Sequence, residues 1–235
     1  NRERIVLTSI TPGAKKVVHS AQFTDPDKAF EWAKQQNEHA NLYYTVNPAR
    51  DVVDKLTQGK RPSAEDIERV FAFKLDVDPV RPKDSSATQA EKDATTRQVL
   101  APLYAFLKAN LAEPMVVDSG NGFNVLVRLE PMAEPTKEFQ RLCETLMDFL
   151  AAKFDVPDVA LLDTSVKDLP RVLALPQTLK RKGENTDERP HRTVTLIGAG
   201  EPCSLNAFTE LASEIAGLWG DRKIRRWVEK LPRFD

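Results

Sequence analysis

Short apolar runs alternate along this chain with longer segments in which apolar residues recur every three or four positions. The first pattern is typical of buried strands and the second of amphipathic helices. Strands are predicted at residues 5–7, 42–47, 70–79, 115–117, 123–127, 159–162, 172–175 and 194–197. Helices are predicted to begin near residues 26, 63, 89, 135, 205 and 221. Because hairpins are mixed with helices in this order, we expect an α+β domain with a mixed sheet rather than a doubly wound parallel sheet.

The strongest strand candidate, residues 70–79, ends in two carboxylates and a proline. Residues i and i+2 of a strand project from the same face, so the side chains of Asp76 and Asp78 can reach one point at the strand end. Two carboxylates on one face repel each other unless a cation lies between them, and Mg²⁺ and Mn²⁺ favour oxygen ligands. A solvated strand end without a ligand is the alternative interpretation.

A third carboxylate, Asp163, follows the separate apolar run 159–162. A two-metal site for phosphoryl transfer needs such an additional acidic ligand. On its own, Asp163 also fits an ordinary aspartate in a turn that follows a strand.

A glycine-rich turn at residues 118–123 joins two predicted strands. Gly120 and Gly122 supply the conformational freedom that a tight hairpin turn requires. Such a turn exposes backbone N–H groups, which together with the Ser119 hydroxyl could hold phosphate oxygens. A plain hairpin turn is the alternative. Beyond it, Phe123 and Asn124 point to opposite faces, so we expect Phe123 in the core and Asn124 toward the metal site.

Basic residues are concentrated between residues 167 and 192 and again at 222–227. The first stretch contains Lys167, Arg171, Lys180, Arg181, Lys182, Arg189, His191 and Arg192. A run of charges is usually a solvated face. The three consecutive cations at 180–182 lie in a predicted loop, however, and this indicates a surface that meets a polyanion.

Composition limits the classes of protein that remain. A formal net charge of −1 argues against indiscriminate coating of nucleic acid but permits a local basic groove. Cys143 and Cys203 are 60 residues apart with no Cys-x-x-Cys pair, so we expect no disulfide framework and a cytoplasmic location. No apolar run is long enough for a membrane span. The 235 residues suffice for one large domain or two small ones. Because the sequence starts without Met, we expect a piece of a longer protein.

In this order, the motifs resemble those of the archaeo-eukaryotic primase superfamily, in particular the primase-polymerases of phages and plasmids. Asp76-x-Asp78 resembles the first motif, residues 118–122 the second and Asp163 the third. The runs 171–183 and 188–192 fit as well, so that the resemblance covers about residues 40 to 195. Two positions depart from the family pattern. Asn124 stands where the family has a histidine, and Gln177 stands where it has a glycine before the threonine.

The resemblance implies an RRM-like catalytic core with an additional α/β unit. Residues 1–200 would form this core, and residues 201–235 a helical extension that leads to a missing downstream region. Members often carry a helicase or a helical primer-assisting domain there. By match to the motifs, Asp76, Asp78 and Asp163 would be the catalytic residues and would bind two Mg²⁺ or Mn²⁺ ions. The incoming triphosphate would meet Ser119, Asn121, Gly122, Asn124, Arg171, Lys180 and Lys182.

The leading hypothesis is therefore a DNA primase or polymerase domain that transfers nucleotides from nucleoside triphosphates, on a single-stranded or primed DNA template. The alternative is a non-catalytic or weakly active module on the same fold that binds single-stranded nucleic acid or a replication origin. The bases of the bound nucleic acid would stack on aromatic side chains such as Tyr43, Tyr44, Phe71, Phe73 and Phe123. A sugar-nucleotide transferase with an Asp-x-Asp motif is a third option, but it would use neither the third carboxylate nor the basic loop.

Overall fold

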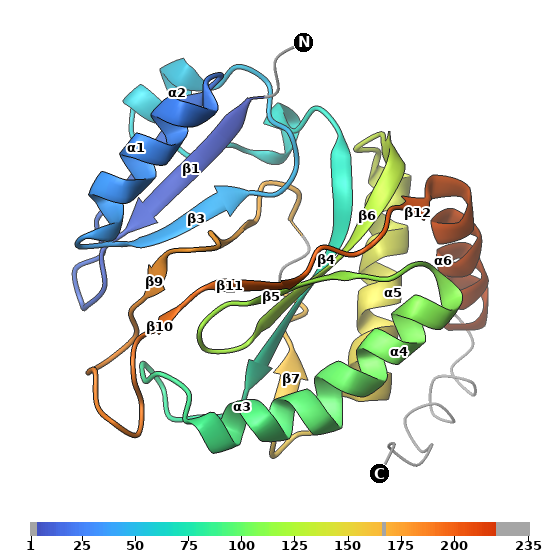
Figure 1. Cartoon of the computed structure of the whole chain (residues 1–235). Coiled ribbons are helices and arrows are strands. Elements are labelled where there is room, and N and C mark those ends of the chain that lie inside the picture. The colour runs from blue at the N-terminus through green and yellow to red at the C-terminus, as the bar shows by residue number, and fades with distance from the viewer. Residues whose placement is uncertain (1–3, 166–167, 220–235) are drawn as a thin grey trace.

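The computed structural model describes residues 4–165 and 168–219, and two sheets form its framework (Figure 1). The N-terminal sheet is antiparallel and has the strand order β2-β1-β3-β8. Its strands are β1 (Ile5–Ile10), β2 (Val18–Phe23), β3 (Asn41–Thr45) and β8 (Val172–Ala174). Strand β8 follows β4 to β7 in the sequence. The N-terminal sheet therefore combines strands from the start of the chain with one from its later part.

The six-stranded central sheet has the order β11-β5-β6-β4-β7, with β12 pairing β6. Its strands are β4 (Val70–Pro79), β5 (Met115–Asp118), β6 (Phe123–Ala133), β7 (Ala160–Leu162), β11 (Thr195–Gly198) and β12 (Cys203–Ser204). The β12–β6 pair is parallel and the others are antiparallel, which makes the sheet mixed. A separate two-stranded ribbon joins β9 (Leu179–Lys180) to β10 (Arg192–Thr193).

Helices cover the outer faces of the two sheets (Figure 1). The helical segments are α1 (Pro26–Asn37), α2 (Val53–Thr57), the 3₁₀ turn Ala64–Asp66, α3 (Gln89–Thr95), the π-helical turn Thr96–Leu100, α4 (Ala101–Asn110), α5 (Lys137–Phe154) and α6 (Leu205–Trp219). Helices α1 and α2 pack on the N-terminal sheet, whereas α3, α5 and α6 pack on the central sheet.

Strand β4 separates the core from the site because its side chains alternate between two faces. Phe73, Leu75 and Val77 are buried in the main core, together with residues of α4, α5 and α6. The opposite face carries Ala72, which packs against Leu173 of the N-terminal sheet, and further along it Asp76 and Asp78. The polar end of β4 therefore faces the side of the central sheet on which the N-terminal sheet lies.

The expected α+β fold with a mixed sheet is confirmed. The helix starts predicted near residues 26 and 63 are confirmed: Asp25 caps α1, and Ser63 with Asp66 forms a capping box. Strand β2 was not predicted, because its sequence is polar and its side chains are exposed or half-buried. It forms through backbone pairing with β1 along its whole length.

Some expectations concern residues outside the described ranges. Lys167, the helix expected at 221–231 and the basic patch at 222–227 all lie there. The domain boundary expected at residue 200 stays a prediction, although α6 packs against α5 and β6. Within the described ranges, no helix combines the length and the apolarity that crossing a membrane requires.

Candidate active site

Three acidic residues meet at the end of β4. Asp76 is paired with Asn124 of β6 on one side. On the other side, the amide of Asp163, which directly follows β7, donates a 2.8 Å hydrogen bond to the Asp76 carbonyl. Directly paired residues of neighbouring strands share a face of the sheet, and Asp78 shares it because it lies two residues further along β4. Asn124, Asp76 and Asp163 therefore form a row across the sheet, with Asp78 beside it.

The environment of this row raises the pKa of Asp76 to about 7. Burial is the largest cause, and the carboxylates of Asp78 and Asp163 add to it. The cations Lys180 and Arg171 act in the opposite direction. The fold thus brings the three predicted carboxylates and two of the predicted cations within electrostatic reach of one another. A nearby positive charge would favour the ionised form of Asp76.

A divalent cation such as Mg²⁺ needs several oxygen donors that converge on one point. Among the described residues, no group of three or more His, Cys, Asp or Glu side chains converges on one point as they stand. Each carboxylate instead turns one oxygen to a protein donor: Asn124 Nδ2 at 2.9 Å for Asp76, Arg81 Nη1 at 3.3 Å for Asp78, and the Ser165 amide at 2.8 Å for Asp163.

The remaining oxygens give the site the chemistry of a hard cation site. The second oxygen of each carboxylate accepts no hydrogen bond from the described part of the chain. The side-chain oxygen of Asn124 is buried beside Asp76 and also lacks a partner there. Oxygen ligands of this kind suit Mg²⁺ or Mn²⁺. The residues therefore fit such an ion, provided that the carboxylates rotate toward one another.

The glycine-rich turn is held by its own polar side chains. The Ser119 Oγ accepts a 3.1 Å hydrogen bond from the amide of Gly122, whose carbonyl accepts one of 2.9 Å from the Ser119 amide. The side-chain oxygen of Asn121 accepts a 2.9 Å hydrogen bond from the amide of Ala87. Both side chains are thus used to build the turn. Their predicted contact with the triphosphate stays a prediction.

Gly122 lies against the end of β4. A Cβ atom at this position would overlap the carbonyl oxygen of Val77 and would lie 2.8 Å from Asp78 Oδ1. Only glycine allows the turn to approach β4 this closely. The absence of a side chain at Gly122 therefore leaves the space that Asp78 occupies. This explains why a glycine is needed at this position of the site.

The predicted cations lie around the acidic row. The Lys180 ammonium donates a 2.7 Å hydrogen bond to the Tyr43 hydroxyl and lies 4.2 Å from the centre of its ring. Burial and then the neighbouring Arg81 cation lower the pKa of Lys182, while Asp78 opposes them. Arg171 is held by the Asp168 carboxylate at 2.8 Å. Together these three residues supply positive charge beside Asp76 and Asp78.

The other arginines of the basic stretch hold the fold together, and among the three cations at 180–182 this applies to Arg181, whose expected contact with a polyanion stays a prediction. The guanidinium of Arg181 donates to the carbonyl oxygens of Asn37 and Ala40, at 2.7 and 3.1 Å. Successive residues of an extended chain point to opposite sides, and this separates Arg181 from its two lysine neighbours. Arg189 likewise pairs with Glu91, and Arg192 donates to the Ala87 carbonyl.

This chain resembles known proteins in structure but not in sequence. No protein-family model matches the sequence, and no curated protein matches it either. Among solved structures, primase RepB′ superposes with a TM-score of 0.51 at 15% identity, over 98% of this chain. The archaeo-eukaryotic primase domain of the cyanophage S-2L primase-polymerase superposes with a TM-score of 0.52 at 13% identity, over 90% of both chains. This chain has the archaeo-eukaryotic primase fold. It spans 64% of the length of the RepB′ chain.

Gln177, one of the two departures from the primase pattern, has an unusual backbone conformation. Gln177 has a φ of +64°, in the left-handed region that favours glycine. A glycine adopts this conformation without strain, whereas the larger glutamine does not. The backbone at Gln177 therefore has the conformation that suits the glycine which the sequence resemblance implies here.

One further residue near the acidic row, Lys74, had no predicted role. It lies two residues before Asp76 on the same face of β4, and its side chain is buried. Its ammonium donates a 2.6 Å hydrogen bond to the Asp168 carbonyl, while the Asp168 side chain holds Arg171. Burial lowers the pKa of Lys74 to about 8. The sequence signal was a lysine inside the apolar run 70–77, where a buried cation needs a partner.

The aromatic residues named for base stacking lie mostly in the interior. Phe73 and Phe123 are buried in the main core. Tyr44 packs between two smaller clusters, and burial raises its pKa to about 12. Tyr43 carries the Lys180 contact. The stacking platform that the non-catalytic alternative needs is therefore not formed by Phe73 or Phe123.

Proposed function

We propose that this chain catalyses metal-dependent nucleotidyl transfer from a nucleoside triphosphate to a 3′-hydroxyl on a DNA template, as a primase or polymerase domain. The observation that carries this proposal is the row of Asp76 and Asp163 with Asp78 beside it, at the end of β4 in a primase fold and with cations nearby. The template, the triphosphates and a downstream helicase or helical domain are the partners that such an activity would use.

In this proposal, Asp76, Asp78 and Asp163 hold the divalent cations. When bound, Mg²⁺ or Mn²⁺ lowers the pKa of the attacking hydroxyl and offsets the charge of the departing pyrophosphate. The protein supplies the positions of the ligands. Asn124 orients the Asp76 carboxylate through its 2.9 Å hydrogen bond, and Gly122 allows Asp78 its place.

The cations bind and orient the triphosphate in this proposal. Lys180 and Lys182 come from one extended segment and lie near the carboxylates. Arg171 is held by Asp168 and, through the Asp168 carbonyl, by the buried Lys74. Charges that are already in place need little reorganisation when the negative charge of the transition state develops.

The test is incorporation of a labelled nucleotide on a primed DNA template with Mg²⁺ or Mn²⁺, and again after removal of the ions with a chelator. The proposal expects template-directed extension that the chelator abolishes. The non-catalytic alternative expects DNA binding without extension under either condition. Binding without any incorporation would therefore overturn the proposal.

Removing the lysines should weaken nucleotide binding. We expect Lys182→Ala to raise the KM for the nucleotide by about 10-fold or more, since hydrogen bonds to charged groups contribute about 1.5–3 kcal/mol. Lys180→Ala should act in the same direction. Steady-state incorporation at varied nucleotide concentration measures the effect.

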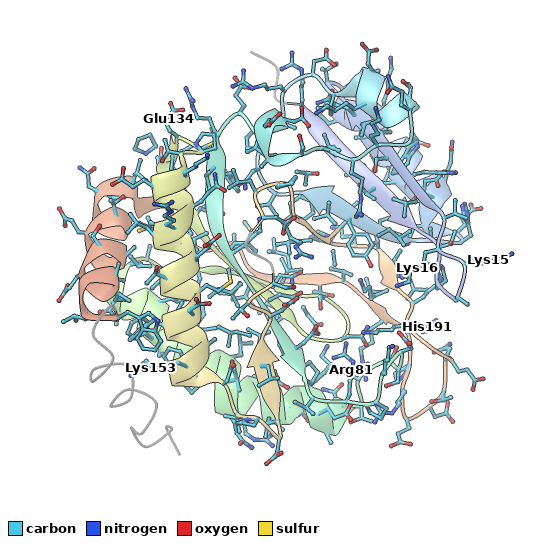
Figure 2. All side chains as sticks on the ribbon, turned by 180° about the vertical axis from the view of Figure 1, so that it is seen from behind. Lys15, Lys16, Arg81, Glu134, Lys153 and His191 are labelled. Carbon is cyan, nitrogen blue, oxygen red and sulfur yellow. The ribbon has the colours of Figure 1, made fainter. Side chains whose placement is uncertain are left out.

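Two control variants accompany this measurement. Lys15→Ala removes an exposed lysine that projects from the turn between β1 and β2 (Figure 2) and should leave the KM unchanged. Tyr43→Phe removes only the hydroxyl that accepts the hydrogen bond from Lys180. The Lys180 ammonium keeps its charge in this variant but loses the contact that positions it. A KM for Lys182→Ala equal to that of Lys15→Ala would contradict the assignment.

A further inference from the structure

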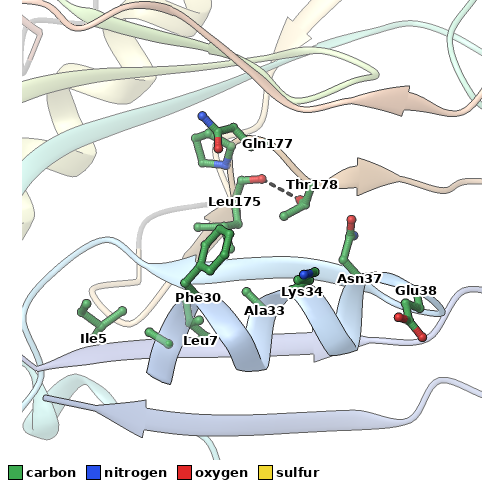
Figure 3. A pocket seen from close by; sticks show the side chains of 12 residues that line it. Ile5, Leu7, Phe30, Ala33, Lys34, Asn37, Glu38, Leu175, Gln177 and Thr178 are labelled. Atoms are coloured by element: carbon green, nitrogen blue, oxygen red, sulfur yellow. Dashed lines mark hydrogen bonds between the residues drawn. The ribbon is translucent and has the colours of Figure 1, made fainter. Parts of the chain in front are cut away.

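A pocket of about 640 Å³ lies between α1 and the segment Leu175–Thr178, away from the acidic row (Figure 3). Its apolar lining comes from Leu7 of β1, Ala29 and Ala33 of α1, and Leu175. The volume lies within the range of small-molecule sites, which are mostly apolar with a few convergent polar groups.

Phe30 makes this pocket unusual. It is 61% exposed, the highest value among the large apolar side chains of the described ranges. Its ring rises from α1 toward Leu175 in the pocket (Figure 3). An aromatic ring left in water beside an apolar hollow offers one face for stacking a flat partner.

Gln177 is the second unusual feature of the same pocket. It is exposed and lines the pocket while its backbone is held in the left-handed region, at a φ of +64°. Strained backbone of this kind tends to occur at ligand sites. Its side-chain amide forms no hydrogen bond within the described part of the chain, so its donor and acceptor are available to a ligand.

The polar rim of the pocket carries one cation and one carboxylate. Lys34 follows Phe30 by one helical turn, is exposed, and has no ion pair among the described residues. Glu38, which directly follows the last residue of α1, also lines the pocket. An anionic chain in this pocket would therefore pass Lys34 and avoid Glu38.

The pocket is connected to the acidic row through the chain itself. Thr178 lines the pocket, and Lys180, two residues later, is near enough to Asp76 for its charge to lower the pKa of that carboxyl. Two residues of extended chain span about 7 Å. A strand that leaves the active site near Lys180 would therefore reach the pocket within a short distance.

We propose that this pocket binds a base of single-stranded DNA, stacked on Phe30, hydrogen-bonded at its edge by Gln177 and followed by a backbone phosphate at Lys34. The flat ring, the hydrogen-bonding edge and the anion are the three groups that these side chains match. The proposal rests on the proposed function only in taking DNA as the ligand.

The test measures the Kd for a labelled oligothymidylate that is long enough to span both sites, with no nucleotide triphosphate present. Because no catalysis is involved, the result can be interpreted whether or not the chain proves to be a polymerase. Loss of one stacked base should raise the Kd of Phe30→Ala at least about fivefold. Ile197→Ala on β11 removes a similarly exposed apolar side chain (59%) far along the chain and should leave the Kd unchanged.

Gln177→Gly gives an independent measure, because stability and binding should move in opposite directions. Relief of the left-handed strain, less the backbone entropy that glycine loses on folding, should raise the Tm by about 1–4 °C, while loss of the amide should raise the Kd for the oligonucleotide. A Kd for Phe30→Ala equal to that of Ile197→Ala, or an unchanged Kd for Gln177→Gly, would overturn the proposal. Equal Kd values for the oligonucleotide together with a changed Kd for thymidine monophosphate would assign the pocket to a free nucleotide and overturn the strand assignment.

Discussion

Replacing Asp76 with asparagine should lower nucleotide incorporation by more than about 100-fold while the protein stays folded. The amide has nearly the same shape, and its oxygen still accepts the hydrogen bond that Asn124 Nδ2 donates at 2.9 Å. It carries no charge, however, and is a poorer cation ligand. Partners in the outer shell of a metal site already contribute about 10–100-fold, so the loss of a ligand should exceed this range.

Primer extension by the purified variant measures the effect. Asp158→Asn is the matched control, since it makes the same chemical change at an exposed carboxylate. A rate for Asp76→Asn equal to that of Asp158→Asn would contradict the role of Asp76.

The same variant should change how stability depends on pH. The pKa of Asp76 in the folded protein is raised to about 7, against about 3.9 in an unfolded chain. Without a cation, the folded protein therefore buries an unfavourable charge above pH 7, and this cost disappears as the pH falls through 7 toward 4.

The free energy of unfolding of the cation-free protein should thus be higher at pH 5 than at pH 8, by at most roughly 3 kcal/mol from this group. Asp76→Asn should lack this part of the decline. Chemical denaturation of both proteins at pH 5 and pH 8, with chelator present, gives the comparison. If the stability of both proteins depended on pH in the same way, the pKa of Asp76 in the folded protein would not be raised.

Gly122→Ala should have the second-largest effect, on activity and on stability together. The added Cβ would overlap the Val77 carbonyl oxygen and lie 2.8 Å from Asp78 Oδ1, so the turn or the end of β4 must move. Inserting a methyl group into a closely packed position costs about 1–3 kcal/mol, which for a chain of this size lowers the Tm by about 2–12 °C. A displacement of about 1 Å in a reacting group can cost about 100-fold in rate.

Gly198→Ala is the control for this change. Gly198 also lies in a strand of the central sheet, but a Cβ there would meet no atom within 4 Å. Its Tm and incorporation rate should stay close to those of the native protein. If Gly122→Ala had the same Tm and the same incorporation rate as Gly198→Ala, the close approach of the turn to Asp78 would not matter for function.

The local parts of the site were predictable from the sequence. The apolar run 70–79 predicted β4, and the period of two placed Asp76 and Asp78 on one face. The glycines predicted the turn between β5 and β6. These features depend on residues that are close in sequence, where propensity and alternation determine the outcome.

The long-range parts were not predictable in this way. Asp163 lies beside Asp76 only because β7 pairs with β4, and no spacing in the sequence fixes that pairing. The distinction between Arg181 and its lysine neighbours likewise depends on the carbonyl oxygens of Asn37 and Ala40, which lie far away in the chain. Strand β2 escaped prediction because backbone pairing with β1, rather than apolar burial, holds it in place.

Direct measurement of Mn²⁺ binding shows whether Asp76, Asp78 and Asp163 together hold a divalent cation. The free Mn²⁺ remaining in titrations of the native protein, Asp163→Asn and the control Asp158→Asn, at pH 8 and without nucleotide, gives the affinity of each. We expect the native protein and Asp158→Asn to bind Mn²⁺ equally well, and Asp163→Asn to bind it at least about 10-fold more weakly. Equal Mn²⁺ affinity of Asp163→Asn and the native protein, or no binding by either, would contradict this expectation.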